Sequence, residues 1–132
     1  MAGENNLEIL LKNASPELNP GRYVFCTLAV PSAEIKDAAI VIIREAEGVT
    51  LVLPEDVAGQ HALRYDYVAS WITLKIHSSL AAVGLTAAFS RVLANKGISC
   101  NVVAGYYHDH IFVACEDTAS ALTTLSSLSS AA

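Results

Sequence analysis

The clearest pattern of hydrophobic and polar positions lies in the second half of the chain. Across residues 70–78 apolar side chains occupy every second position, which predicts a β-strand with one buried face. From Leu85 the spacing changes to three and four residues, which predicts a helix that packs on the sheet. Gly97, after the cation Lys96, suits the left-handed turn that ends a helix. The alternating residues are Ile72, Leu74 and Ile76, and the helical stripe is Leu85, Ala88, Phe89, Val92 and Leu93.

A hairpin and a second helix follow. Alternation resumes over residues 98–102 and again over residues 111–115, and the polar turn between them predicts an antiparallel pair of strands. Asp117 or Thr118 can cap a last helix with a narrow apolar stripe. The order strand, helix, strand, strand favours a ligand-sensing α+β sheet module over an enzyme. The stripe of the last helix is Leu122, Leu125 and Leu128.

The first half of the chain repeats this design less regularly. It predicts a short helix near residues 7–11, a strand at 23–29, a hairpin of residues 39–44 and 49–53, and a helix that opens at Pro54. We therefore expect two α+β units, each with an antiparallel sheet. The expected division is an N-terminal unit of residues 1–64 and a C-terminal unit of residues 65–132.

Composition excludes nucleic acid as a direct ligand. The chain has 132 residues, 53% of them hydrophobic and 16% charged, and its formal net charge is −5. Residues 1–66 hold ten acids and five bases, whereas residues 67–132 hold three of each, so no basic cluster is present to neutralise phosphates. The neutral, apolar second half favours contacts between subunits, and we expect a homodimer or a higher homo-oligomer.

We expect a cytoplasmic protein without a membrane span. The longest apolar run covers residues 38–43, far short of the roughly 20 residues that cross a bilayer. The N-terminus lacks the basic region and the cleavage site of a signal peptide. Cys26, Cys100 and Cys115 are odd in number and widely spaced, which favours reduced, buried thiols over disulfides or a zinc site.

Neither a metal site nor a cofactor is expected. His108 and His110 flank Asp109 in the hairpin turn, and an exposed polar turn explains these residues better than metal ligation. Catalysis also finds little support, because the chain lacks the G-x-S-x-G, phosphate-loop and Cys-x-x-Cys motifs. Helix capping explains the adjacent acids Glu55 and Asp56.

Residues 72–117 resemble an ACT domain, the small regulatory fold that binds amino acids in aspartokinases and many other metabolic enzymes. The likeness rests on a strand, a loop with Val83-Gly84-Leu85, a helix, Lys96-Gly97-Ile98 and a hairpin. The whole chain is similar to small stand-alone tandem ACT proteins. This resemblance implies a ferredoxin-like βαββαβ sandwich in each of two ACT-like units, with the helices on one face of the sheet. An acylphosphatase-like activity on such a fold calls for an arginine, which residues 78–86 lack.

The chain departs from the ACT pattern in two places. Residues 78–84 replace the usual Asp/Asn-x-Pro-Gly of the ligand loop, which leaves the identity of the ligand open. The chain also ends on a helix where an ACT unit should supply a fourth strand. We therefore predict that the missing strand comes from elsewhere, with residues 23–29 as the candidate, so that the two units interlock.

The candidate ligand site lies at the start of the helix that begins at Leu85. Uncovered backbone N–H groups and the positive end of the helix dipole suit an α-carboxylate, and nearby polar side chains suit the other polar groups of an amino acid. The alternative is structural. In it, Gly84 permits a tight turn, Ser78 or Ser79 caps the helix, and Asn101 is a solvated strand residue. The candidate ligand-binding residues are Ser78, Ser79, Val83, Gly84, Leu85, Ser99 and Asn101.

The expected function is non-catalytic and regulatory. The protein is expected to bind a small amino acid at an interface between units or subunits, and to pass that state to a partner such as an enzyme that it regulates. Coupling of this kind requires that the ligand prefer one arrangement of the units. The alternatives are an interaction module without a ligand and, third, a small-molecule enzyme. A gain in thermal stability with one particular amino acid would support the sensor. A thermal stability that depends only on protein concentration would support the interaction module.

Overall fold

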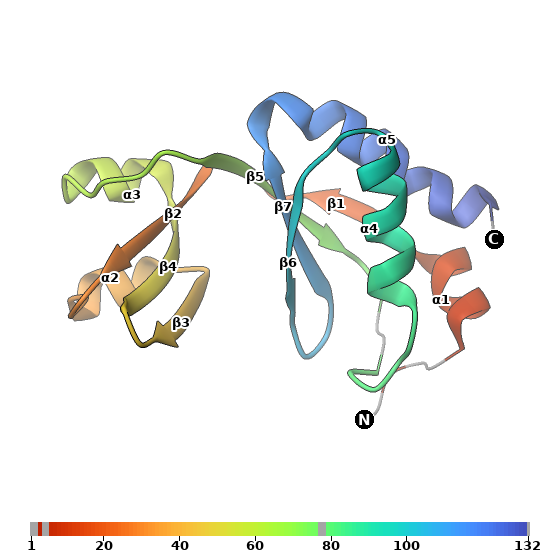
Figure 1. The fold of residues 1–132 in the computed structure, drawn as a ribbon, viewed down its shortest axis with the longest axis horizontal. Coiled ribbons are helices and arrows are strands. Elements are labelled where there is room, and N and C mark those ends of the chain that lie inside the picture. Colours follow the sequence, from red (N-terminus) through yellow and green to blue (C-terminus); the bar gives the residue numbers. More distant parts are fainter. Residues whose placement is uncertain (1–2, 4–5, 77–78, 132) are drawn as a thin grey trace. The chain divides into compact units, whose positions relative to one another are not determined.

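The computed structural model describes residues 3, 6–76 and 79–131. Its contacts divide the chain into two compact units. The terminal unit combines residues 1–19 with residues 70–132, and the central unit consists of residues 20–69. The red and the blue ends of the ribbon therefore belong to the same unit (Figure 1).

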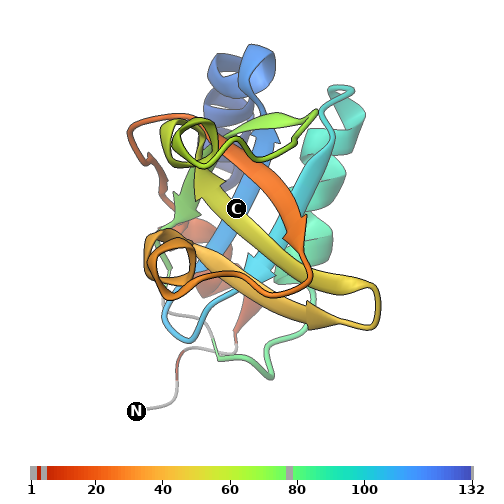
Figure 2. The ribbon, with the colours of Figure 1, turned by 90° about the vertical axis from the view of Figure 1, so that its left-hand side faces the viewer.

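In the central unit, three antiparallel strands carry two short helices on one face. The strand order is β3 (Val41–Glu45), β4 (Gly48–Pro54) and β2 (Tyr23–Leu28), and β2 also pairs with the start of β5 (Val68–Leu74). The helices α2 (Ala33–Ala38) and α3 (Glu55–Gln60) lie in front of these strands in Figure 2. The core between helices and strands consists of Val24, Cys26, Ile35, Leu51, Leu53 and Ala58.

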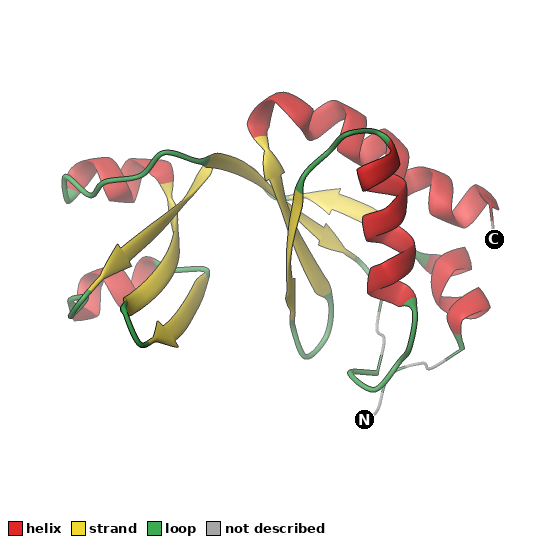
Figure 3. Cartoon of the chain, viewed as in Figure 1, coloured by secondary structure: helices red, strands yellow, loops and turns green. Residues whose placement is uncertain are grey.

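In the terminal unit, three helices pack on a sheet with the strand order β1, β5, β7, β6 (Figure 3). Apolar stripes of the helices meet every second residue of the strands, so the polar faces of the helices stay in solvent. The core includes Leu10, Ile72, Leu74, Phe89, Leu93, Ile111, Val113 and Leu125. The elements are α1 (Leu7–Asn13), β1 (Pro16–Leu18), the end of β5, α4 (Leu85–Asn95), β6 (Cys100–Ala104), β7 (Asp109–Ala114), the 3-10 turn η1 (Cys115–Asp117) and α5 (Thr118–Ala131).

The predicted fold class is confirmed. Helix α4 begins at Leu85 as the spacing predicts, β6 and β7 form the antiparallel hairpin, and α5 begins at Thr118. The hairpin of β3 and β4 in the first half is confirmed as well. Helix α2 was not predicted, because its six residues bury only Ile35 and carry no apolar stripe. Its start is marked by Ser32, whose Oγ accepts a hydrogen bond from the Ile35 amide at 3.2 Å.

The fourth strand of the terminal unit is β1, so the predicted source, residues 23–29, was wrong. Strand β1 pairs with β5 through Pro16 opposite Leu74 and Leu18 opposite Ile72. Strand β2 instead pairs with β4 along its whole length. The sequence concealed β1 because it is three residues long and begins with Pro16, a turn signal that an edge strand tolerates. The wider expectation, that the missing strand comes from elsewhere in the chain, is correct.

Candidate functional site

Helix α4 begins at a glycine that holds a left-handed conformation. Gly84 has φ of 99° and ψ of −14°, and its carbonyl accepts the first helical hydrogen bond from the Ala88 amide at 2.9 Å. A Cβ at this position would lie 3.1 Å from Leu7 Cδ2, so glycine is favoured by both the backbone and the packing of α1. No side chain caps α4 in the described part of the chain. Its first-turn N–H groups therefore have no side-chain partner among the described residues.

The loop before α4 folds on itself rather than on the helix. The Ser79 hydroxyl accepts a hydrogen bond from the Ala81 amide at 3.1 Å, and the Ser79 carbonyl accepts one from the Ala82 amide at 3.0 Å. The structural alternative, in which Ser79 caps the helix, is therefore wrong. Ser78 lies outside the described residues. Val83 is 84% exposed, whereas the side chain of Leu85 belongs to the core and leaves only its backbone for binding.

Ser99 and Asn101 lie at the other end of α4. The helix has 11 residues, which at a rise of 1.5 Å per residue separate its two ends by about 16 Å. Both residues are exposed, and Ser99 lines a shallow depression with Ser90 and Arg91. The structure thus brings Ser79, Val83, Gly84 and Leu85 together, but it does not bring Ser99 and Asn101 to them.

A polar cluster around His110 was not predicted from the sequence. Trp71 Nε1 donates a hydrogen bond to His110 Nδ1 at 3.0 Å, and Thr73 Oγ1 lies 3.3 Å from the same nitrogen. Asn19 Nδ2 donates to Thr73 Oγ1 at 2.9 Å. Burial lowers the pKa of His110, the charge of His108 lowers it further and the charge of Asp109 opposes the shift, which favours the neutral ring that can accept the indole N–H. This arrangement joins Asn19, the residue after β1, to β5 and β7 and is structural.

The hairpin turn is less exposed than predicted. Asp109 belongs to β7 and is buried, and burial raises the pKa of its carboxyl group although the charges of His110 and His108 oppose that shift. Strand β7 begins at Asp109, two residues before the apolar alternation of residues 111–115 that predicted it. Tyr106 and Tyr107 remain exposed and contact each other edge to face.

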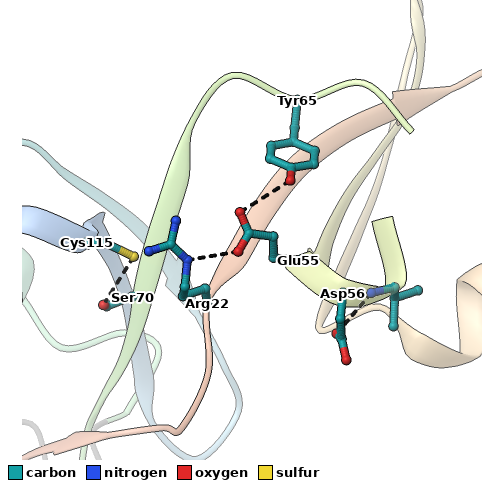
Figure 4. A network of polar contacts seen from close by, with 7 residues as sticks. Arg22, Glu55, Asp56, Tyr65, Ser70 and Cys115 are labelled. Carbon is teal, nitrogen blue, oxygen red and sulfur yellow. Dashed lines mark hydrogen bonds and ion pairs between the residues drawn. The ribbon is translucent and has the colours of Figure 1, made fainter. Parts of the chain in front are cut away.

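A second polar cluster ties α3 to the start of β2 in the central unit. Arg22 Nε donates to Glu55 Oε1 at 2.8 Å, and the Tyr65 hydroxyl donates to Glu55 Oε2 at 3.3 Å (Figure 4). The Asp56 carboxylate accepts a hydrogen bond from the Val57 amide at 2.9 Å. The two neighbouring acids therefore have separate partners instead of forming a catalytic pair. Both lie in the first turn of α3, but no described side chain caps that helix, so the capping explanation was wrong.

The Arg22–Glu55 contact yields a pH prediction. The hydrogen bond from Arg22 holds the pKa of Glu55 below its usual value, so this contact stabilises the fold above the unfolded pKa and is lost as pH falls through the folded pKa. Arg22→Met is expected to raise the pKa of Glu55, which a carboxyl-detected NMR titration measures. Lys36→Met removes an exposed cation from the same unit and is expected to leave it unchanged. An unshifted Glu55 titration in Arg22→Met would contradict the assignment.

Metal and membrane sites find no support in the described residues. Within them no group of three or more His, Cys, Asp or Glu side chains could hold a metal ion. No helix there combines the length and the apolar character needed to cross a bilayer. Cys26, Cys100 and Cys115 are free thiols, but only Cys26 is buried as predicted, and Cys100 and Cys115 are partly exposed. Burial raises the pKa of Cys26 and of Cys100. Cys115 Sγ accepts a hydrogen bond from the Ser70 hydroxyl at 3.8 Å within the terminal unit (Figure 4).

Two family models, both described as ACT domain, match the chain over residues 2–70 and 67–127. The chain belongs to the ACT domain family. ACT domains are regulatory, ligand-binding modules as a class, and that general role follows for this chain. The predicted boundary between two ACT-like units at residue 64 stays a prediction. The two compact units described above are defined by contacts within the fold, which place residues 1–19 in the terminal unit.

Solved structures agree with this assignment. A Vibrio cholerae protein, described as of unknown function and as a possible transport protein, is 49% identical, with a TM-score of 0.84 over 93% of this chain and 95% of that one. An Agobacterium tumefaciens protein is 20% identical, with a TM-score of 0.70 over 89% and 90%. The regulatory subunit of aspartate kinase from Thermus flavus has the same fold at 9% identity, with a TM-score of 0.61 over 97% and 99%. None of the curated proteins matches the chain.

Proposed function

We propose that the protein is a non-catalytic regulator that binds a small amino acid at the start of α4. The observation that carries this proposal is the start of the helix itself, where Gly84 takes a left-handed turn and no described side chain occupies the first-turn N–H groups. Such a helix start offers several donors and about half a positive charge to an α-carboxylate. The regulatory character of the ACT family supports the same role.

The proposed ligand is small or apolar. Ser79, Val83 and Leu85 supply a hydroxyl and apolar surface around the helix start, and no charged side chain occurs among residues 79–90. A charged amino acid side chain would therefore have no ionic partner in this loop. We propose further that a cytoplasmic homo-oligomer passes the liganded state to an enzyme, in line with the regulatory subunit of aspartate kinase that shares the fold.

The rival proposal is an interaction module without a ligand. Leu80 and Val83 are 68% and 84% exposed beside the same helix start, and they could be covered by a protein partner. The two functions differ in their response to small molecules, because only a ligand that binds the folded state raises the melting temperature at fixed protein concentration.

Thr86→Asp separates them in one experiment. Thr86 is exposed in the first turn of α4. An aspartate at this position interacts favourably with the helix dipole and competes with a ligand carboxylate for the first-turn N–H groups. In a thermal-shift screen of the twenty amino acids, one of them at about ten times its Kd is expected to raise the melting temperature of the wild type by about 5 °C. The variant should remain folded and lose that rise, and Thr86→Asn should keep it. No rise with any amino acid would overturn the ligand proposal in favour of the interaction module.

A further inference from the structure

The face of the terminal sheet that points away from its helices carries the polar cluster around His110. Every second residue of β5 and β7, among them Ile72 and Ile111, packs in the core beneath the helices. Because successive side chains of a strand point to opposite faces, Trp71, Thr73 and His110 lie on the other face of the same strands. All of these residues belong to the terminal unit. The hydrogen bonds between them therefore form within one compact unit.

One ring nitrogen of His110 receives two contacts. The indole N–H of Trp71 donates to His110 Nδ1 at 3.0 Å, and Thr73 Oγ1 lies 3.3 Å from the same nitrogen. The indole has a donor and no acceptor, so Nδ1 must accept and cannot carry a proton. The ring therefore holds its single proton on Nε2, a tautomer that the hydrogen-bond network assigns.

A second proton on this ring has only Nδ1 to bind. There it would point at the indole N–H, so the contact with Trp71 would change from a hydrogen bond into two opposed donors. Thr73 could instead accept the new proton, because its hydroxyl rotates. The Trp71 contact is therefore the one that protonation breaks. Trp71 also stacks on the fully buried Phe112, with ring centroids 6.4 Å apart, so displacement of the indole changes the packing of this face.

The charged groups around His110 do not compensate a charged ring. On β7, the charge of His108 disfavours protonation and the charge of Asp109 favours it, and burial outweighs both, so the pKa of His110 is lowered. On the same face, Glu17 of β1 and Lys75, which follows β5, pair with each other at 3.2 Å. The residue of β6 opposite His110 is uncharged. No described carboxylate forms an ion pair with His110, so its protonation opposes the folded arrangement.

We propose that His110 is a pH-sensitive switch within the terminal unit: its neutral ring holds the Trp71 indole between β5 and β7, and protonation of Nδ1 releases that indole. The folded state lowers the pKa of His110, so this contact stabilises the unit above the unfolded pKa, and that stabilisation is lost as pH falls through the folded pKa. The switch does not rest on the proposed function, because the start of α4 contributes no residue to it.

The indole N–H reports on the switch in the full chain, since Trp71 is the single tryptophan. In a ¹⁵N-resolved NMR titration from about pH 8 to about pH 5, the Nε1–H signal is expected to lose its hydrogen-bonded chemical shift. The midpoint should equal that of the His110 ring signals, while the core amides stay dispersed. An indole signal that stays in place while His110 titrates would overturn the switch. Loss of the core amides at the same midpoint would also overturn it, because the whole unit would then be unfolding.

Variants of the histidines assign the transition. His110→Gln keeps a side-chain acceptor that does not titrate, so the indole transition should disappear. His61→Gln removes a histidine of the central unit and is the matched control, which should keep the transition at the same midpoint. His108→Gln removes a charge that lowers the pKa of His110, so the midpoint should move to higher pH. A transition that persists in His110→Gln would contradict the assignment.

The reverse experiment removes the donor. Trp71→Phe keeps an aromatic ring beside Phe112 but has no indole N–H, so the neutral ring of His110 loses the bond that favours it. The His110 ring signals should then titrate at a higher pH than in the wild type, and a thermal melt checks that the variant is folded. An unshifted His110 midpoint in folded Trp71→Phe would show that the indole and the proton do not compete for Nδ1.

Discussion

Removal of residues 1–19 is expected to abolish the cooperative unfolding transition of the terminal unit. The segment supplies β1 and the helix α1, and it buries Leu10 and Ala14 in the core of that unit. Loss of one buried leucine alone typically costs about 2–5 kcal/mol, and whole domains are stable by only about 5–15 kcal/mol. Deletion of the segment also exposes the edge of β5 that pairs with β1.

Trp71 makes this result measurable. It is the single tryptophan of the chain and belongs to the terminal unit, so its fluorescence during urea denaturation reports on that unit. Deletion of residues 1–5 is the matched control, because it leaves α1 and its cap residue Asn6 in place. Addition of a peptide of residues 6–19 should restore part of the transition. A truncated chain that unfolds at the same urea concentration as the full chain would show that the terminal unit folds without its N-terminal segment.

This dependence also explains which parts of the fold were open to prediction. The regular elements follow from periodicity, since Phe89 and Leu93 repeat at helical spacing and Ile111 and Val113 alternate, and each of these residues is buried. Strand β1 could not be found in this way. A strand of three residues has no period to detect, and its place beside β5 depends on contacts about 55 residues apart in the chain.

The candidate site was predicted in part for the same reason. The glycine at the helix start was visible, because Gly84 precedes an apolar stripe and only a few residues adopt its backbone conformation. Ser99 and Asn101 follow the end of α4, so the length of this helix alone separates them from Gly84, and the prediction overlooked that separation.

Phe89→Ala is the point substitution with the largest expected effect. Phe89 is fully buried at the centre of α4 and belongs to the same core as Ile72 and Ile111. Its truncation removes apolar burial and leaves a cavity, so the free energy of unfolding is expected to fall by about 3–5 kcal/mol. The Trp71 fluorescence transition should move to lower urea with little change in slope.

The same substitution tests whether the packing of α4 supports the proposed amino acid site. The helix carries that site at its start, so a variant that loosens α4 as a whole should weaken the response to the amino acid. Thr86→Asp should remove the same response without a loss of stability. Val83→Ala, at an 84% exposed position, should change stability by less than about 0.5 kcal/mol and serves as the control. Wild-type stability in Phe89→Ala would show that the packing of α4 is not what holds this site in place.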